Sequence, residues 1–205
     1  MPALKKITKE DILKACIKIV RKDGMEALNA RRIATELKCS TQPMFYVYTN
    51  MEEIKKDVIN EIYNIFYESV FKSNYNQVVY KDIGRNYVMF AKKEPILYKI
   101  LFASEKTDAL SNLMNLTGPL ESVREIISKQ TGLSSDDVLD FHTSMWLYTN
   151  GLTSSIVNNI YTLDDDEIDR LLGEQYLAKL LLEVKKGKVK KEVADFYFDN
   201  KLIRK

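Results

Sequence analysis

Glycine, proline, cysteine and histidine are scarce in this sequence of 205 residues, with 7, 4, 2 and 1 copies respectively. Few glycines and prolines disfavour a chain of many tight turns, and no Gly-rich or Pro-rich linker divides the sequence. Because leucine, isoleucine, lysine and glutamate are abundant instead, the composition predicts an all-α protein. Apolar residues make up 45% of the chain, which is enough for the core of one ordinary domain or two small ones.

Long apolar runs are also missing. No run approaches the roughly 18 residues that a membrane span needs. The N-terminal segment MPALKKITKEDI lacks the apolar core of a signal peptide. Cys16 and Cys39 are a poor basis for a disulfide framework, and Cys16 stands at an apolar helix position where we expect a buried thiol. These absences predict a cytoplasmic protein.

The motifs of the common enzyme classes are absent as well. The sequence has no phosphate loop, no dinucleotide fingerprint, no His-Glu metal motif and no complete Ser/His/Asp set. We therefore predict no catalytic residues, no metal and no cofactor, and a protein that is not an enzyme. A helical enzyme with a concealed site is the less favoured alternative.

Charge is nearly balanced over the whole chain, with a net of +2, but it is unevenly distributed. Residues 1–50 carry ten Lys or Arg against five Asp or Glu, a net charge of +5, and residues 51–205 carry a net of −3. Positive charge at one end predicts contact with a polyanion, and a solvated helix face is the alternative. Within that basic end, the segment STQPMFYVYTN (residues 40–50) has no charge.

Capping residues divide the N-terminal region into short helices. Thr8 predicts the start of a first helix, and Gly24 predicts its end because glycine suits a left-handed C′ position. Asn29 caps a second helix that reaches Leu37. After a very short connection, Ser40 caps a third helix over about 41–47.

This arrangement predicts a helix-turn-helix, whose second helix lies in the major groove of DNA. Pro43 falls in the first turn of the third helix, where its missing N–H costs little. Thr41 and Gln42 stand beside it and can hydrogen-bond base edges, while Pro43 can touch a thymine methyl. Tyr46 offers a hydroxyl to a phosphate. We expect the core to hold the two side chains Met44 and Tyr48, and long-range attraction to come from Lys5, Lys6, Lys9, Arg31, Arg32, Lys55 and Lys56.

Helical periodicity continues through the rest of the chain. Ser135 and Asp164 are expected caps, Pro95 is tolerated at a helix start, and Pro119 should kink or divide its helix. The expected helices cover about 51–70, 78–92, 95–104, 108–130, 135–160, 164–186 and 188–199.

Residues 8–56 resemble the DNA-binding domain of the TetR (tetracycline-repressor-like) family, through ILKACIKIVRKDGMEALNARRIATELKCSTQPMFYVYTNMEEI. Spacing and residue classes agree over about a quarter of the chain. Departures are Asn29 for a common Thr, Lys38 for the usual turn glycine, Phe45 for a usual Tyr and Met51 for a frequent phosphate-binding Lys. The DNA-contacting residues we expect are Asn29, Arg31, Ser40, Thr41, Gln42, Pro43, Phe45, Tyr46, Lys55 and Lys56.

The resemblance implies a second, C-terminal helical domain that binds a small molecule and dimerises. Residues 1–50 would form the DNA-binding domain, a helix over about 51–70 would connect, and 51–205 would form the effector and dimerisation domain. Aromatic and Met side chains would line a pocket for an apolar or aromatic effector: Tyr63, Phe66, Tyr87, Phe90, Phe102, Met114, His142 and Trp146. Small and apolar side chains would form a dimer interface, with an intramolecular core as the alternative: Gly151, Leu152, Ser155, Ile168, Leu171 and Leu172.

The function implied is that of a homodimeric transcriptional regulator, a repressor that a small-molecule effector releases from a palindromic operator. Two reading heads are needed because one short helix buries too little surface for tight specific binding. A DNA-binding protein of the same architecture without an effector, such as a nucleoid or cell-division factor, is the main alternative. A ligand-sized cavity in the C-terminal domain would distinguish the two.

Overall fold

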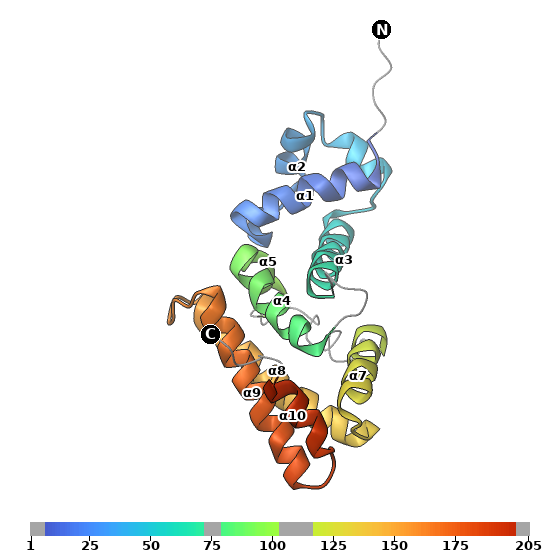
Figure 1. Ribbon diagram of the computed structural model, residues 1–205. Coiled ribbons are helices and arrows are strands. Elements are labelled where there is room, and N and C mark those ends of the chain that lie inside the picture. The colour runs from blue at the N-terminus through green and yellow to red at the C-terminus, as the bar shows by residue number, and fades with distance from the viewer. Residues whose placement is uncertain (1–6, 72–78, 103–116, 200–205) are drawn as a thin grey trace. The chain divides into compact units, whose positions relative to one another are not determined.

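The computed structural model describes residues 7–71, 79–102 and 117–199, and every regular element within them is helical (Figure 1). The predicted all-α class is confirmed for this part of the chain. None of its helices is long and apolar enough to cross a membrane. The elements are α1 (Lys9–Asp23), η1 (Met25–Ala27), α2 (Ala30–Leu37), η2 (Gln42–Tyr46), α3 (Met51–Val70), α4 (Tyr80–Lys93), α5 (Pro95–Phe102), α7 (Thr117–Thr131), α8 (Ser135–Val157), α9 (Asp165–Lys185) and α10 (Lys191–Asp199).

Contacts divide the chain into two compact units. The first comprises Met1–Glu68 with Glu94–Leu110, and the second comprises Ser69–Lys93 with Ser111–Lys205. The first unit extends beyond the expected 1–50 because α1 packs against α5 and the Arg21 guanidinium pairs with the Glu94 carboxylate at 3.1 Å.

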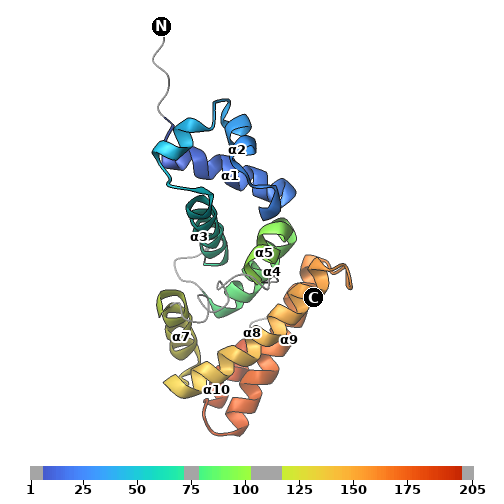
Figure 2. The same ribbon diagram turned by 180° about the vertical axis from the view of Figure 1, so that it is seen from behind.

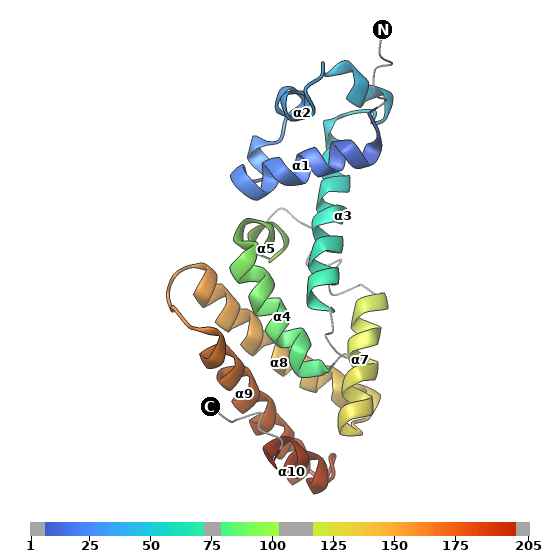
Figure 3. The ribbon, with the colours of Figure 1, turned by 45° about the horizontal axis from the view of Figure 1, so that its top comes forward.

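In the first unit, α1 and α2 lie side by side and their boundaries follow from local chemistry (Figure 3). Thr8 Oγ1 accepts the Asp11 N–H at 3.1 Å, and Asp11 accepts the Thr8 N–H at 3.0 Å, which forms the predicted capping box. Gly24 ends α1 with a φ of +77°, a conformation that costs glycine little.

The core of the first unit is built from one face of α1 and the residues packed on it. Ile12, Cys16 and Val20 are completely buried, at one-turn spacing along α1. Burial raises the pKa of the Cys16 thiol to about 12, so the thiol stays protonated at neutral pH, as expected for a core cysteine.

In the second unit, α8 and α9 run side by side, with α4 packed on both, α7 on α8 and α10 on α9 (Figure 2). An apolar seam joins α4 to α9 through Val88, Ile168 and Leu172, which are all buried. Capping fixes the start of α9, because Asp164 accepts the Glu167 N–H at 2.8 Å and Glu167 accepts the Asp164 N–H at 3.0 Å.

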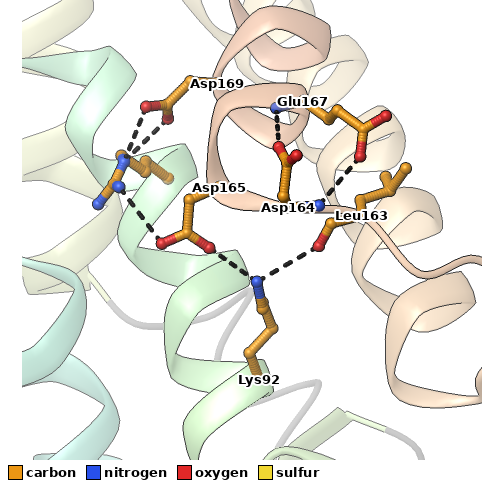
Figure 4. A network of polar contacts seen from close by, with 7 residues as sticks. Lys92, Leu163, Asp164, Asp165, Glu167 and Asp169 are labelled. Atoms are coloured by element: carbon orange, nitrogen blue, oxygen red, sulfur yellow. Dashed lines mark hydrogen bonds and ion pairs between the residues drawn. The ribbon is translucent and has the colours of Figure 1, made fainter.

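Ion pairs flank this seam (Figure 4). Lys92 Nζ lies 2.8 Å from Asp165 Oδ1 and 3.4 Å from the Leu163 carbonyl oxygen. Arg85 Nε donates to both carboxylate oxygens of Asp169, at 2.9 and 3.2 Å. Hydrogen bonding from Lys92 lowers the pKa of Asp165. Because these side chains are partly exposed, the ion pairs contribute little to the free energy of folding. Their main effect is to fix the register of α4 on α9.

Several predicted boundaries need correction. Ser134, rather than Ser135, caps α8, since its hydroxyl accepts the Asp137 N–H. α8 ends at Val157 instead of about residue 160, and Asn159 adopts a φ of +57° just beyond it. α10 begins at Lys191 because Gly187, with a φ of +74°, turns the chain after α9. Of the helix expected over 108–130, the described part is α7, with Pro119 in its first turn.

Candidate nucleic-acid interface and interior cavity

The turn between α2 and η2 depends on a left-handed residue. Lys38 has φ +55° and ψ +43°, and its N–H donates to the carbonyls of Ala34 and Thr35. The Cys39 N–H also donates to Ala34, at 3.0 Å. Lysine therefore adopts the conformation that glycine takes most easily, at the position where the resemblance places a turn glycine.

Beyond the turn, η2 is a 3₁₀-helix rather than the predicted α-helix, and Ser40 is not its N-cap. An α-helix capped by Ser40 would offer the N–H groups of its second and third residues to the serine hydroxyl. The third residue is Pro43, which has no N–H. The chain instead enters η2 through Thr41, whose backbone is already helical and whose side chain makes no capping bond. The prediction that Pro43 marks a helix start is confirmed.

One side chain anchors η2 and others face outward. Met44 is completely buried and Tyr48 is 2% exposed, which confirms both as core. Phe45 is 42% exposed, Tyr46 is 76% exposed, and Gln42 is also exposed. The uncharged segment therefore combines a fixed inner face with an outer face of amide, ring and hydroxyl groups.

Two asparagines of the motif act as helix caps. Asn29 Oδ1 accepts the Arg32 N–H at 3.0 Å and so begins α2 as predicted. Asn50 Oδ1 accepts the Glu53 N–H at 2.9 Å at the start of α3. Asn29 remains exposed, so a capping role does not remove it from the surface.

The cations expected around η2 differ in their partners. Lys9 Nζ lies 2.6 Å from Asp57, Lys55 Nζ lies 2.9 Å from Glu52, and Arg32 pairs with Asp23. The ion pair with Lys9 lowers the pKa of Asp57. Arg31 and Lys56 are exposed and form no ion pair within the described residues, while Lys5 and Lys6 lie outside them.

Inside the second unit, three of the predicted ligand residues meet around a cavity of about 60 Å³. Tyr87, His142 and Trp146 line it, and neighbouring residues complete the wall. Those neighbours are Tyr80, Lys81, Ile83, Gly84, Met145, Thr149, Leu172 and Tyr176, none of them predicted as ligand contacts. Tyr80 and Tyr176 are aromatic like most of the predicted ligand residues, but the prediction did not include them. Only the packing of α4, α8 and α9 shows that they share a wall.

The wall of the cavity is mainly apolar, and it carries a few neutral hydrogen-bonding groups. His142 Nδ1 and the Tyr80 hydroxyl are 2.9 Å apart, and burial lowers the pKa of His142 to about 4. The Tyr87 hydroxyl donates to Asn150 at 3.0 Å. The Tyr176 hydroxyl is buried without a hydrogen-bond partner in the described part of the chain. A cavity lined in this way suits an uncharged molecule better than an ion.

The other predicted ligand residues lie elsewhere. Tyr63, Phe66 and Phe102 form an aromatic cluster in the first unit, with the Phe66 and Phe102 ring centroids 5.1 Å apart. Phe90 is buried in the second unit but does not line the cavity, and Met114 lies outside the described residues. A wider open groove, of about 570 Å³, runs between α1 and α3 without any predicted ligand residue.

The predicted dimer residues divide into two groups. Ile168 and Leu172 are 0% and 3% exposed in the seam with α4, so a second copy cannot contact them, and for these two the intramolecular alternative is correct. Leu152 packs partly against the same seam. Gly151 is exposed, whereas Ser155 and Leu171 are half-buried. Exposed apolar side chains on these two helices include Leu139 and Leu147 on α8 and Leu181 and Leu182 on α9.

Comparisons with known proteins bear on the fold. No family model and no curated protein matches the sequence. Among solved structures, the chain is similar to a TetR family protein from Vibrio parahaemolyticus, with 13% sequence identity and a TM-score of 0.55. The similarity covers 82% of this chain and 96% of that one. The chain therefore shares the fold that the sequence resemblance implied, a helix-turn-helix followed by a helical bundle.

Proposed function

We propose that this chain is a DNA-binding transcriptional regulator. The observation that carries the proposal is η2, which Met44 holds from inside while Gln42, Phe45 and Tyr46 face outward. A short, firmly anchored helix with an uncovered polar and aromatic face is what groove reading requires. The basic N-terminal region and the fold shared with a TetR family protein support the same function.

Except for Phe45, the predicted contacts take one of two roles in this proposal. Thr41, Gln42 and Pro43 meet base edges, because they begin the reading helix. Phosphates meet the residues around it, which fix the position of the helix without reading sequence. Those phosphate-binding residues are Asn29, Arg31, Ser40, Tyr46, Lys55 and Lys56.

We further propose that two copies bind a palindromic operator. Exposed leucines on α8 and α9 support an interface there, where Leu147 is 59% exposed and Leu181 is 49% exposed. Gly151, Leu152, Ser155 and Leu171 complete the proposed surface. Sedimentation of the purified chain tests it, because Leu147→Glu should convert dimers to monomers while Leu139→Glu, an exposed leucine nearer the start of α8, should not.

Regulation by an effector has one observation for it and one against it. The apolar cavity with neutral hydrogen-bonding groups supports release of the DNA by a small uncharged molecule. Its volume of about 60 Å³ is well below the roughly 300–1,000 Å³ of ordinary ligand pockets. That difference favours the effector-free alternative unless α4 and α8 separate on binding. Release of operator DNA by phenol or indole, abolished in His142→Phe, would decide for the effector.

Selection of bound duplexes from a random DNA pool is the experiment that tests DNA binding. We expect an enriched palindrome whose half-sites are about one helical turn or more apart. The control is a Thr41→Ala, Gln42→Ala double variant, which should retain weak binding but enrich no sequence. Failure of the unaltered protein to enrich any sequence would contradict the proposed function.

A further inference from the structure

We propose that η2 reads A·T base pairs, with the Gln42 amide on adenine and the Phe45 ring on a thymine methyl group. This inference rests on the proposed function and specifies the chemistry of the operator. It concerns base readout by η2 alone, and leaves phosphate contacts to the cations around it.

The 3₁₀ geometry places Gln42 and Phe45 on one ridge. Residues three apart in a 3₁₀-helix lie directly above one another, whereas in an α-helix they are about 60° apart around the axis. Both Gln42 and Phe45 are exposed. The neighbouring ridge, Pro43 and Tyr46, also reaches the surface, while Met44 points into the core. An amide and an aromatic ring are thus presented together.

These two groups match the major-groove edge of A·T pairs. A glutamine amide can donate to adenine N7 and accept from its N6 amino group, and an apolar ring can cover the thymine 5-methyl group. Guanine is read chiefly by Arg or Lys. The segment Ser40–Asn50 contains neither residue, so η2 lacks the side chains that most often read guanine.

The exposure of Phe45 adds a second argument. At 42% exposed, its ring faces solvent next to Tyr46, at 76%, and Val47, at 37%, whereas Met44 and Tyr48 of the same segment are buried. Arg31 and Lys56 are exposed cations on α2 and α3, the helices before and after η2. An apolar side chain on η2, with exposed cations on the helices before and after it in the chain, suits a groove floor with methyl groups and two rows of phosphates.

Substitution of uracil for thymine provides the test, since it removes only the methyl group. The probe is the duplex enriched from the random pool, with thymines replaced one at a time. Burial of one methyl group predicts a loss of about fourfold in affinity at one position of each half-site. Phe45→Ala should bind the thymine duplex correspondingly more weakly and should be indifferent to uracil at that position. Phe198→Ala is the matched control, because Phe198 is an exposed phenylalanine on α10.

A parallel substitution tests the amide. Replacing the contacted adenine by 7-deazaadenine removes the N7 acceptor, and the loss should disappear in Gln42→Ala. Half-sites read only through G·C pairs, or a duplex indifferent to uracil at every position, would overturn this readout and leave the proposed function intact. A pool without any enriched sequence would overturn both.

Discussion

The interior around Met44 in the first unit differs from the interior around Met145 in the second. Met44, on the inner face of η2, is completely buried, while the outer face of this helix is uncovered. Met145 is 5% exposed and borders a cavity among aromatic side chains. Tight packing resists displacement of the groups it supports, whereas a void lets its walls move at little cost. The first interior suits a surface of fixed geometry, and the second suits a response to a small molecule.

The largest expected effect tests this contrast directly. Met44→Ala should lower the free energy of unfolding by about 2–5 kcal/mol, because truncation of a fully packed side chain leaves a new cavity. Met145→Ala is the matched change at a side chain that already faces a void, so it should cost less. Denaturant unfolding followed by far-UV circular dichroism measures both. Equal losses would show that the two interiors are packed alike.

Protonation of His142 is the next test, because it acts on the second interior alone. Folding lowers its pKa from an ordinary value near 6.5 to about 4, through burial. The unfolded chain therefore binds this proton first, and stability present above pH 6.5 should fall as pH drops towards 4. The loss should reach roughly 3 kcal/mol at most.

His142 is the only histidine of the chain, so the interval between pH 6.5 and 5 reports this residue. The carboxyl groups with lowered pKa values, such as Asp57 and Asp165, titrate below that interval. The measurement is the free energy of unfolding as a function of pH for the unaltered protein and His142→Gln. A slope that persists in His142→Gln would assign the proton to another group.

The sequence predicted elements well where local chemistry decides them. Thr8, Asn29 and Asp164 cap helices as expected, because a cap depends on the few residues around it. The change of η2 from α to 3₁₀ was missed, although Pro43 signals it through its absent N–H. Apolar periodicity identified Ile168 and Leu172 as buried, but it could not tell a seam within the chain from an interface between chains.

The cavity shows the same limit. Tyr87, His142 and Trp146 were predicted as its lining, but Tyr80 and Tyr176 were not. Their aromatic side chains were a signal that could have placed Tyr80 and Tyr176 in the predicted set. Which aromatics meet depends on the packing of α4, α8 and α9, and that information is tertiary rather than local. Tyr63 and Phe66 illustrate the same limit, since these equally good candidates lie in a different aromatic cluster.

Base readout gives a smaller expected effect, on the outer face of the first unit. Gln42→Ala should weaken binding to the selected operator by about 1–3 kcal/mol, the value of one bidentate contact to a base. Binding to unrelated DNA should be nearly unchanged, because phosphate contacts remain. Titrations of both duplexes at the same salt concentration measure the difference. Equal losses on the two duplexes would make Gln42 a phosphate or structural residue.

The exposed cation of α3 should affect all sequences alike. Lys56→Ala should lower affinity for operator and unrelated DNA together and reduce the salt dependence of binding by about one unit of slope. Lys185→Ala removes an exposed lysine from α9 and serves as the control. Affinities measured across a range of salt concentrations give the slopes. An unchanged slope would exclude Lys56 from the phosphate contacts.

Lys38 provides the smallest effect and separates the geometry of the turn from its charge. Its φ of +55° is a conformation that costs a side chain with a Cβ more than it costs glycine. Lys38→Gly should raise the free energy of unfolding by about 0.5–1 kcal/mol, because relief of this strain exceeds the added freedom of the unfolded chain. Lys38→Ala keeps the Cβ and removes the charge, so it should not stabilise the protein. If Lys38→Gly also leaves operator affinity unchanged, the lysine charge has no part in DNA binding. A loss of affinity in both variants would instead place Lys38 among the phosphate contacts and explain why the turn retains a strained lysine.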